Sequence, residues 1–325
     1  MSFYKNKRVL VTGGAGFIGS YLVELLVADE AKVTVADNLC RGTLKRIASV
    51  KNKIKLLELD LSDYRNCLLA CKEQEIVMNL AAKVTGIEYN RTHQAEMFIS
   101  NMNLQQNVIK AAAERGVKRF LQVSTACIYP HDAKVPTPES EGDRGSPEPT
   151  NLGYGWAKRM GEQLAQFYAK DSSMKVTIVR PFNSYGLRDH FDEATSHVIP
   201  ALIKRVLDGE NPVVVWGTGN QSRVFIHAKD VAKAMRIVAE RYANVDAVNI
   251  GHDNEITMKN LISLILEITG KDVKVVFDTS KPDGYPRRAA DTTKLKRITE
   301  GWVPDTPLEE GIKEMVEQFK THRSP

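Results

Sequence analysis

A glycine-rich turn between an apolar strand pattern and a helical pattern restricts the fold of this chain more than any other feature. The strand pattern covers Arg8–Thr12 and the helical pattern covers Phe17–Ala28. Gly13 permits a tight turn, Gly16 lets the backbone approach a pyrophosphate at the helix N-terminus, and Gly19 lets the helix pack closely on the strand. The sequence therefore predicts a dinucleotide-binding strand-turn-helix unit.

Short β-branched runs alternate with longer helical patterns as the chain continues. We predict six strands, at Arg8–Thr12, Lys32–Asp37, Lys53–Leu59, Glu75–Leu80, Lys118–Ser124 and Lys175–Arg180. These runs lack polar alternation, which is typical of strands buried on both faces of a parallel sheet. Helical spacing over Gln94–Arg115 and Tyr154–Lys170 supplies helices to cover it. The expected fold class is α/β, with a Rossmann-like doubly wound parallel sheet.

After Arg180, prolines divide the chain into shorter elements, among them a predicted helix at Val198–Leu207 and a predicted strand at Val213–Trp216. We predict a dinucleotide-binding domain over residues 1–182, with segments near 224–252 returning to its sheet. Residues 183–325 are expected to form a smaller α/β region that mainly binds substrate. The Pro- and Glu-rich stretch Pro136–Thr150 is expected to be an exposed loop.

Charge and cysteine content narrow the possible partners. The formal charge of +5 is spread along the chain without a basic block, which disfavours nucleic acid and suits an anionic small substrate. The four cysteines, Cys40, Cys67, Cys71 and Cys127, form no C-x-x-C pair. We therefore expect reduced thiols in the cytoplasm, with no disulfide and no metal site. Long uninterrupted apolar runs are lacking, so a membrane span is not expected.

Acidic residues at strand ends bear on the cofactor. Asp37 closes the second predicted strand, where a carboxylate accepts hydrogen bonds from the ribose hydroxyls of adenosine. The same charge repels a 2′-phosphate, so NAD is favoured, although the nearby Arg41 is able to hold a phosphate and leaves NADP open. Asp60 suits either the adenine edge or the N-cap of the next helix. The candidate cofactor-binding residues are Gly13, Gly16, Phe17, Ile18, Gly19, Asp37, Asn38, Arg41, Asp60, Leu61, Leu80, Ala81, Ala82 and Lys158.

Tyr154 and Lys158 lie four residues apart, on one face of a predicted helix. A Lys ammonium one helical turn away is expected to lower the pKa of the phenol toward neutrality. This spacing also arises by chance, but here it follows a predicted strand that ends in Ser124-Thr125. With these residues the chain resembles the extended short-chain dehydrogenases/reductases over nearly its full length. The resemblance implies a triad of Thr125, Tyr154 as acid/base and Lys158, with hydride exchange at C4 of a nucleotide-activated sugar.

The residues after Thr125 narrow the subfamily. Dehydratases of this family carry an Asp-Glu pair where this chain has Ala126-Cys127. A Cys followed by Ile-Tyr-Pro is similar to the GDP-L-fucose synthases and GDP-mannose 3,5-epimerases. The resemblance implies that Cys127 removes a proton beside a 4-ketone and that His197 is its partner acid. A C4 ketone acidifies the hydrogens on C3 and C5, so the pair is chemically reasonable. Cys127 as a buried apolar residue and His197 as a surface residue are the plainer alternatives.

The same resemblance implies a set of substrate-binding residues: Asn183, Val198, Trp216, Arg223 and Lys281, the last within Asp278–Gly284. Arg287 and Arg288 are weaker candidates. It also implies a homodimer formed through the helices at Gln94–Arg115 and Tyr154–Lys170.

The expected function is that of a nucleotide-sugar epimerase or epimerase/reductase, with a GDP-sugar as substrate and a 4-keto intermediate. The fucose synthases use NADPH, whereas Gly13–Gly19 with Asp37 resembles the epimerases that retain NAD, so the net reaction stays open. A UDP-sugar 4-epimerase with tightly bound NAD is the alternative. A scaffold that binds NAD without catalysis has no evident use for Thr125, Tyr154 and Lys158 together.

Overall fold

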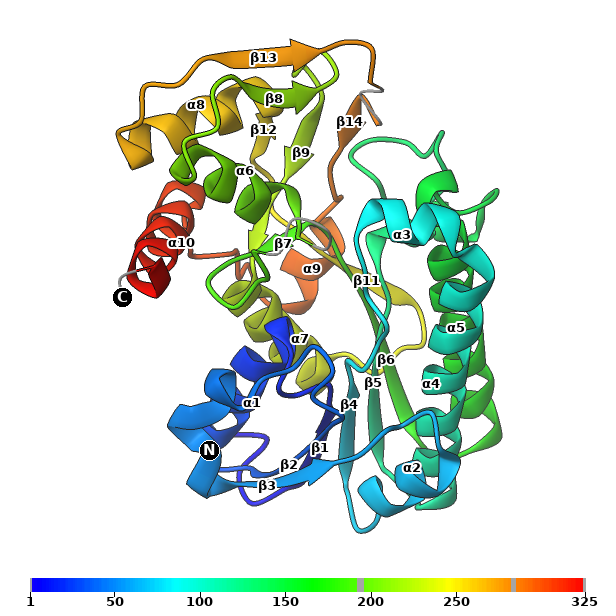
Figure 1. Cartoon of the computed structure of the whole chain (residues 1–325). Coiled ribbons are helices and arrows are strands. Elements are labelled where there is room, and N and C mark those ends of the chain that lie inside the picture. The colour runs from blue at the N-terminus through cyan, green and yellow to red at the C-terminus, as the bar shows by residue number, and fades with distance from the viewer. Residues whose placement is uncertain (1, 192–195, 282–284, 324–325) are drawn as a thin grey trace.

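The computed structural model describes residues 2–191, 196–281 and 285–323. Its main element is a seven-stranded sheet in which every neighbouring pair is parallel (Figure 1). The strands are, in spatial order, β11 (Ala247–Ile250), β6 (Lys175–Pro181), β5 (Arg119–Val123), β4 (Ile76–Asn79), β1 (Arg8–Thr12), β2 (Lys32–Asp37) and β3 (Ile54–Glu58). The order reverses between β1 and β4, as in a doubly wound fold. The predicted fold class is confirmed.

Helices cover both faces of this sheet. One face packs against α1 (Phe17–Ala28) and α7 (Ala228–Arg241). The other packs against α2 (Tyr64–Ala70), α4 (Gln94–Glu114) and α5 (Leu152–Asp171). β1 supplies both cores, because Val9 and Val11 face one layer and Leu10 faces the other. β3 lies at the edge and exposes Lys55 and Glu58, so its burial differs from that of the inner strands.

A second group of elements lies above the large sheet in Figure 1 and has its own core. Its helices are α6 (Val198–Leu207), α8 (Met258–Thr269) and α10 (Leu308–Arg323). Its strands form small sheets from β8 (Val213–Trp216) with β13 (Val275–Asp278), from β9 (Ser222–Val224) with β12 (Glu255–Thr257) and β14 (Arg287–Arg288), and from β7 (Ser184–Tyr185) with β10 (Ile226–His227). The connecting helices are α3 (Ile87–Thr92) and α9 (Thr293–Ile298). β11 and α7 return to the large sheet, while the domain boundary after residue 182 stays a prediction.

The prediction of an exposed loop at Pro136–Thr150 is wrong in part. Thr137 and Glu148 are buried. The Thr137 nitrogen donates a hydrogen bond to the Ala289 carbonyl at 2.8 Å. The Asn249 nitrogen donates to a Glu139 carboxylate oxygen at 2.9 Å. The loop is therefore packed against β11 and the segment after β14, which a local sequence pattern does not reveal.

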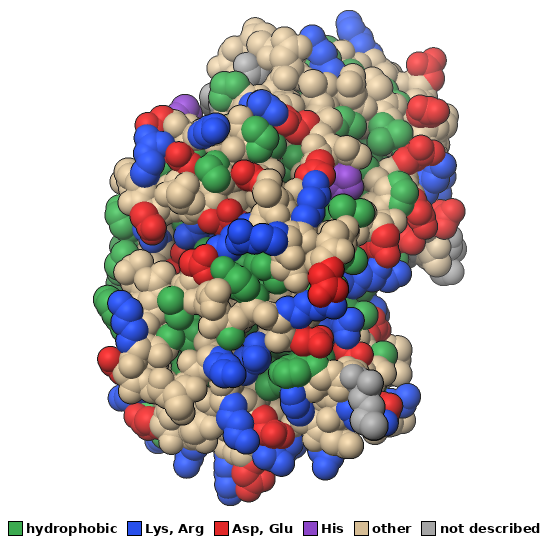
Figure 2. All heavy atoms as spheres, turned by 180° about the vertical axis from the view of Figure 1, so that it is seen from behind, with side chains coloured by type: hydrophobic (Ala, Val, Ile, Leu, Met, Phe, Trp, Pro, Cys, Tyr) green, Lys and Arg blue, Asp and Glu red, His purple; other side chains and the backbone are tan. Residues whose placement is uncertain are grey.

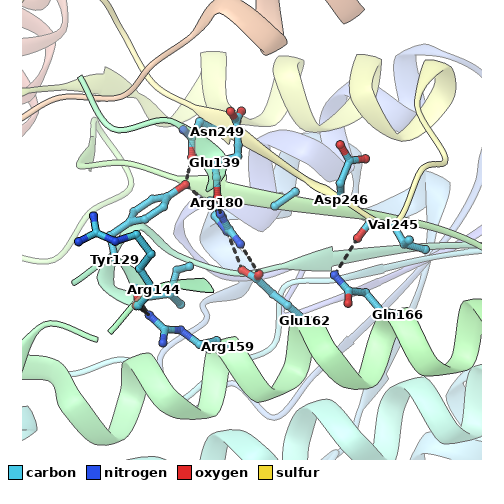
Figure 3. Close-up of polar contacts among 12 residues, drawn as sticks. Tyr129, Glu139, Arg144, Arg159, Glu162, Gln166, Arg180, Val245, Asp246 and Asn249 are labelled. Carbon is cyan, nitrogen blue, oxygen red and sulfur yellow. Dashed lines mark hydrogen bonds and ion pairs between the residues drawn. The ribbon is translucent and has the colours of Figure 1, made fainter. Parts of the chain in front are cut away.

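A buried ion pair joins α5 to β6 of the large sheet. The Arg180 guanidinium of β6 lies 2.6 Å from the Glu162 carboxylate of α5, and both side chains are about 5% exposed or less. Arg180 also donates to the Tyr129 hydroxyl at 3.0 Å, and Tyr129 donates to Asn249 Oδ1 at 2.5 Å. Figure 3 shows Arg180 between these partners. The pair thus connects α5, β6 and the segment that follows β5.

Replacing Glu162 with Gln should destabilise the protein strongly, because the Arg180 charge would remain buried without its counter-ion. We expect the free energy of unfolding to fall by about 3–5 kcal/mol, measured by urea denaturation. As a control, Glu309→Gln removes an exposed pair with Lys313 on α10 and should leave the urea midpoint nearly unchanged. Equal midpoints for Glu162→Gln and the parent would contradict the structural role of the pair.

Candidate active site

The candidate residues gather at the edge of the large sheet where its parallel strands end. Gly13 follows β1 with φ at +66°, and a Cβ atom there would lie 3.1 Å from the Ala81 nitrogen. A Cβ atom on Gly19 would lie 2.2 Å from the Gly13 carbonyl oxygen. Both positions therefore require glycine. Gly19 brings α1 against the turn itself, rather than against the strand as predicted.

The start of α1 fits the pyrophosphate of a dinucleotide. Gly16 is the N-cap residue and provides no side-chain hydrogen bond. The first backbone N–H groups of α1 therefore lack a side-chain cap, and such a helix start attracts anions. Phe17 and Ile18 are half-buried against the core and fix the direction of the helix.

Asp37 is buried at the end of β2, beside the glycine turn. Its two carboxylate oxygens accept hydrogen bonds from the Ala15 nitrogen at 3.0 Å and the Leu39 nitrogen at 2.9 Å. Because each oxygen has a further lone pair, the carboxylate remains able to accept from ribose hydroxyls. Asn38 is exposed, and its side-chain oxygen accepts from the Cys40 nitrogen at 3.2 Å.

Asp60 lies just after β3 and is not the N-cap of α2, which was one of its two expected roles. Its carboxylate accepts from the Ser62 nitrogen at 2.9 Å. Asp63 caps α2 instead, by accepting from the Arg65 nitrogen at 2.9 Å. An extra turn between strand and helix explains the difference. Leu61 is buried in the core beneath this turn.

Leu80, Ala81 and Ala82 follow β4 and are half-buried. The Ala81 nitrogen donates to Thr12 Oγ1 at 3.1 Å, which holds this segment next to the glycine turn. Their place at the sheet edge fits a cofactor that crosses between β1 and β4, as proposed for doubly wound folds.

A chain of buried polar side chains connects this edge to α5, and the sequence patterns did not reveal it. Thr12 Oγ1 donates to Asn79 Oδ1 at 2.7 Å, and Asn79 Nδ2 donates to Gln122 Oε1 at 3.2 Å. Gln122 Nε2 donates to Gln105 Oε1 at 2.7 Å, and Gln105 Nε2 donates to the Ala157 carbonyl at 2.9 Å. The chain fixes β1, β4, β5, α4 and α5 relative to one another, because buried polar groups need such partners. The sequence did contain a signal for this chain of contacts: Asn79 and Gln122 are amides within otherwise apolar strands.

The structure brings Thr125, Cys127, Tyr154 and Lys158 together beyond the end of β5. Thr125 precedes the short helix η2 (Ala126–Ile128), and its hydroxyl accepts from the Cys127 nitrogen at 3.2 Å. On α5, Lys158 Nζ donates to the Val123 carbonyl at 3.0 Å and lies 5.8 Å from the centre of the Tyr154 ring. Their chemical roles stay predictions.

Burial dominates the titration of this group. It raises the pKa of Tyr154 above its ordinary value; Cys127 adds to the rise and a hydrogen bond with Thr125 opposes it. Burial also lowers the pKa of Lys158 to about 8, against the attraction of Glu162. The net shift of the Tyr154 pKa is therefore opposite to the expected lowering, and burial is its largest cause.

Two charged residues complete the surroundings of Cys127. Arg288 Nη2 donates to the Cys127 sulfur at 3.6 Å, and Arg288 Nη1 lies 3.0 Å from Glu148 Oε2. A small hollow of about 30 Å³ adjoins them, with Ala126, Tyr285 and Arg288 in its wall. Arg288 was only a weak candidate from the sequence, because it is one of two adjacent arginines. Glu148 was not a candidate, because the surrounding stretch was expected to be exposed.

His197 belongs to a separate polar group. Its Nδ1 lies 2.8 Å from the buried Asp189 carboxylate, whose other oxygen accepts from the His190 nitrogen at 2.8 Å. Burial lowers the pKa of His197, but the hydrogen bond and charge of Asp189 outweigh it, so the net pKa is raised; Arg41 opposes the rise. No polar contact among the described residues joins His197 to Cys127. Asp189 was not found from the sequence, since no motif marks it.

Two predicted substrate residues meet at the end of a small sheet. Trp216 ends β8, which pairs with β13, and Lys281 follows β13. Lys281 Nζ lies 5.8 Å from the centre of the Trp216 ring. Residues 282–284, in the same predicted substrate loop (Pro282, Asp283 and Gly284), lie outside the described residues.

The other predicted substrate residues are Asn183, Arg223 and Val198. Among the described residues, no contact joins them to Trp216 or Lys281. Asn183 Nδ2 donates to the Val224 carbonyl at 3.0 Å. Arg223 Nη1 donates to the Tyr285 carbonyl at 2.7 Å, which places it next to the surroundings of Cys127. Val198 is exposed as the first residue of α6.

Within the described ranges, no group of three or more His, Cys, Asp and Glu side chains is arranged to hold a metal ion. None of the helices in those ranges combines the length and apolar character that crossing a membrane requires.

Comparisons with known proteins agree with this geometry. The model of the NAD dependent epimerase/dehydratase family matches residues 9–251. The chain is 35% identical over 321 residues to the probable GDP-L-fucose synthase 1 of Oryza sativa subsp. japonica, covering 97% of this chain and 92% of that protein. It is 33% identical over 327 residues to the GDP-L-fucose synthase of Escherichia coli (strain K12), covering 97% of each. The structure of UDP-glucose 4-epimerase from Thermotoga maritima superposes with a TM-score of 0.87 at 30% identity, covering 98% of this chain and all of that one.

Replacing Asp189 with Asn should lower the pKa of His197, because the carboxylate that favours the imidazolium would lose its charge. The protonated fraction of His197 at a given pH then falls. NMR titration of the imidazole signals measures this shift, with His197→Gln to assign the resonance. Replacing the more distant Asp208 with Asn is the control and should leave the His197 pKa in place; an unchanged pKa in Asp189→Asn would contradict the assignment.

Proposed function

This chain belongs to the NAD dependent epimerase/dehydratase family, and from that premise we propose that it is an NAD(P)-dependent nucleotide-sugar epimerase or epimerase/reductase. The observation that carries the proposal is the grouping of Thr125, Cys127, Tyr154 and Lys158 at the sheet edge that also holds the glycine turn. A scaffold without catalysis has no need for an acid/base phenol, an ammonium and a thiol in one buried place.

The cofactor in this proposal is NAD, with NADP as the less favoured form. The start of α1 would hold its pyrophosphate, Asp37 its adenosine ribose and Lys158 its other ribose. A bound nicotinamide supplies the hydride acceptor and donor for C4 of the sugar. The Asp37 carboxylate disfavours a 2′-phosphate by charge, whereas Arg41, four residues further along the chain, attracts one.

The chain's own residues then move protons. Tyr154 exchanges the proton of the C4 hydroxyl, and its raised pKa keeps the phenol protonated when it acts as an acid. The Cys127 thiolate removes a proton from the carbon beside the 4-ketone. His197, whose pKa is raised, returns a proton to the opposite face of the ring. This last step requires His197 and Cys127 to meet across the substrate.

The substrate that we propose is a GDP-sugar. This choice is supported by relatives named GDP-L-fucose synthase, which match this chain over nearly its full length. Cations near the candidate site also suit a diphosphate: Arg223 lies beside the surroundings of Cys127, and Lys281 lies over Trp216.

A UDP-sugar 4-epimerase is the second candidate. It is favoured by the likeness to the Thermotoga maritima UDP-glucose 4-epimerase and by Asp37, which suits a retained NAD. In that reaction the hydride at C4 is the only carbon-bound hydrogen that moves, together with the proton of the C4 hydroxyl, so Cys127 has no chemical step to perform. The two candidates therefore differ in whether carbon-bound hydrogen exchanges with water.

Replacing Cys127 with Ser should abolish solvent deuterium uptake at C3 and C5, because a hydroxyl is too weak a base to replace the thiolate. The parent and variant are incubated in D₂O with a GDP-4-keto-hexose, and with UDP-glucose and NAD in parallel, and uptake is measured by mass spectrometry. Binding of NAD(P), followed by fluorescence, should be unchanged.

Replacing Tyr154 with Phe provides the comparison, since it should lower turnover by about 10²–10⁴-fold on either substrate. Deuterium uptake that survives in Cys127→Ser would contradict the C3/C5 epimerase. Turnover of UDP-glucose without any uptake would favour the 4-epimerase instead.

We also propose that the protein is a homodimer joined through α4 and α5. Ile99 on α4 is 57% exposed and Phe167 on α5 is 53% exposed, although both are large apolar side chains. Figure 2 views the molecule from behind and shows apolar side chains along the edge where α4 and α5 lie, on the left of this view. A second copy of the same face would cover them in a symmetric four-helix contact.

The variant Phe167→Glu should be monomeric, because a charge would be buried at the centre of this contact. Light scattering after size-exclusion chromatography measures the mass. Leu69→Glu is the control: Leu69 is 54% exposed on α2, outside the proposed contact, and this variant should remain dimeric. A monomeric parent protein, or a dimeric Phe167→Glu variant, would contradict the proposed interface.

A further inference from the structure

Cys127 lies against a buried ion pair formed by two segments distant in sequence. Arg288, on β14, donates from Nη2 to the Cys127 sulfur at 3.6 Å. Its Nη1 lies 3.0 Å from Glu148 Oε2, and the two side chains are only 17% and 11% exposed. One guanidinium therefore faces both the thiol and the carboxylate.

The backbone holds this arrangement in place. The Glu148 nitrogen donates to the Cys127 carbonyl at 3.3 Å, and Thr150 Oγ1 donates to the other Glu148 carboxylate oxygen at 2.9 Å. Gly155 of α5 allows the close approach, because a Cβ atom there would lie 2.8 Å from the Cys127 carbonyl oxygen. The carboxylate is thus fixed without help from the arginine, and Arg288 is clamped between two fixed groups.

The charges around the sulfur act in opposite directions. The pKa of Cys127 is raised overall, and burial is the largest cause; Arg288 lowers it, Glu148 raises it, and hydrogen bonds from Thr125 and Arg288 lower it. Tyr154 and Tyr285 also face the thiol, and both are phenols with raised pKa values that remain neutral near pH 7. For Glu148, burial raises the pKa but Arg288 and hydrogen bonds outweigh it, so the carboxylate is ionised. Arg288 is the cation acting on Cys127 among the described residues.

We propose that Arg288, clamped by Glu148, is the positioning residue that stabilises the thiolate of Cys127, and that Glu148 limits this stabilisation. The inference deepens the proposed function and rests on it. The thiolate takes a proton from the carbon beside the 4-ketone and becomes a thiol, while the C–H electron pair passes into the enolate. The guanidinium N–H holds the sulfur lone pair in place before this transfer and, by its charge, favours the ionised form of the base.

The neighbouring arginine provides a matched control. Arg287 is half-exposed and pairs with Glu255, with its Nε 2.9 Å from that carboxylate. It belongs to the same strand β14 but makes no contact with Cys127 that the described residues show. Changing either arginine removes one positive charge from the same strand. A shift that appears in the Arg288 variant and not in the Arg287 variant must therefore come from the contact of Arg288 with the sulfur.

The test measures the ionisation of Cys127 directly. The whole protein, without substrate, is alkylated with iodoacetamide over a pH series, and the rate at Cys127 is followed by peptide mass spectrometry. Only the thiolate reacts, so the rate rises with pH through the pKa of the thiol. The exposed Cys40 reports on the reagent in the same sample. The proteins compared are the parent, Arg288→Gln, Glu148→Gln, Arg287→Gln and the double variant Arg288→Gln/Glu148→Gln.

We expect Arg288→Gln to move the Cys127 midpoint to higher pH. Alkylation below the midpoint should then be slower by about tenfold for every pH unit that the midpoint moves. Glu148→Gln should move it to lower pH, because the full arginine charge then acts on the sulfur. The double variant, in which no unpaired charge is buried, should lie between the parent and Arg288→Gln. Arg287→Gln should match the parent.

A parental midpoint in both Arg288→Gln and the double variant would overturn the proposal, and so would an equal displacement in Arg287→Gln. The rising limb of deuterium uptake against pH gives a second readout, since it should move to higher pH with the alkylation midpoint. Alkylation does not require turnover. If Cys127→Ser keeps deuterium uptake, the proposed function is contradicted. The alkylation series still tests the effect of Arg288 on the Cys127 thiol, because it needs no substrate.

Discussion

The buried pair of Arg180 and Glu162 is the interaction on which the geometry of the candidate site depends. It fastens α5 to β6, and through the Tyr129 hydroxyl it also reaches the segment that carries Cys127. Arg159, one turn before Glu162, donates to the Ile128 carbonyl and to the Gly145 carbonyl at 2.6 Å. Tyr154 and Cys127 come from different elements, so their separation is set by these buried contacts. A partner lost from such a pair leaves a charge that the interior cannot solvate.

Hydrogen bonds across the large sheet also fix α5 relative to the glycine turn, where we propose that the cofactor binds. The chain from Thr12 through Asn79 and Gln122 to Gln105 ends on the backbone of α5 at Ala157, next to Lys158. Amides are oriented donors and acceptors, so each link fixes a direction as well as a distance. The glycine turn and α5 are thereby fixed to one another across three strands. A hydride acceptor and a phenol must be held in this way if their relative geometry is to favour reaction.

Local patterns predicted most of the fold because local physics determines it. The bounds of β1, β2, α1, α6 and β8 match the predicted ranges, since short apolar runs and the helical spacing of apolar residues are strong local signals. The Thr125, Tyr154 and Lys158 grouping was also accessible, because a strand end and a helix start define it. The pairing of Glu148 with Arg288 was not, since the two residues lie far apart in the sequence, and Arg288 was only a weak candidate for substrate binding. Asp189 is close to His197 in the sequence, but it lies in an irregular segment that no motif marks. The prediction of an exposed loop at Pro136–Thr150 was wrong in part because the loop packs against residues far along the chain, such as Asn249 and Ala289.

The charged partners of Cys127 and His197 differ in sign, which bears on the base and acid roles that we propose for these two residues. A thiolate needs a cation beside it, and Cys127 has Arg288 at 3.6 Å. An imidazolium needs an anion, and His197 has the buried Asp189 at 2.8 Å. If the two titrating groups shared one environment, the same change in charge would drive both toward the same form and either the base or the acid would be lost. Burial keeps the net pKa of Cys127 raised, but Arg288 lowers it, and Asp189 raises the pKa of His197. Oppositely charged partners thus shift the two groups in the two directions that the proposed proton transfers on opposite faces of the sugar ring require.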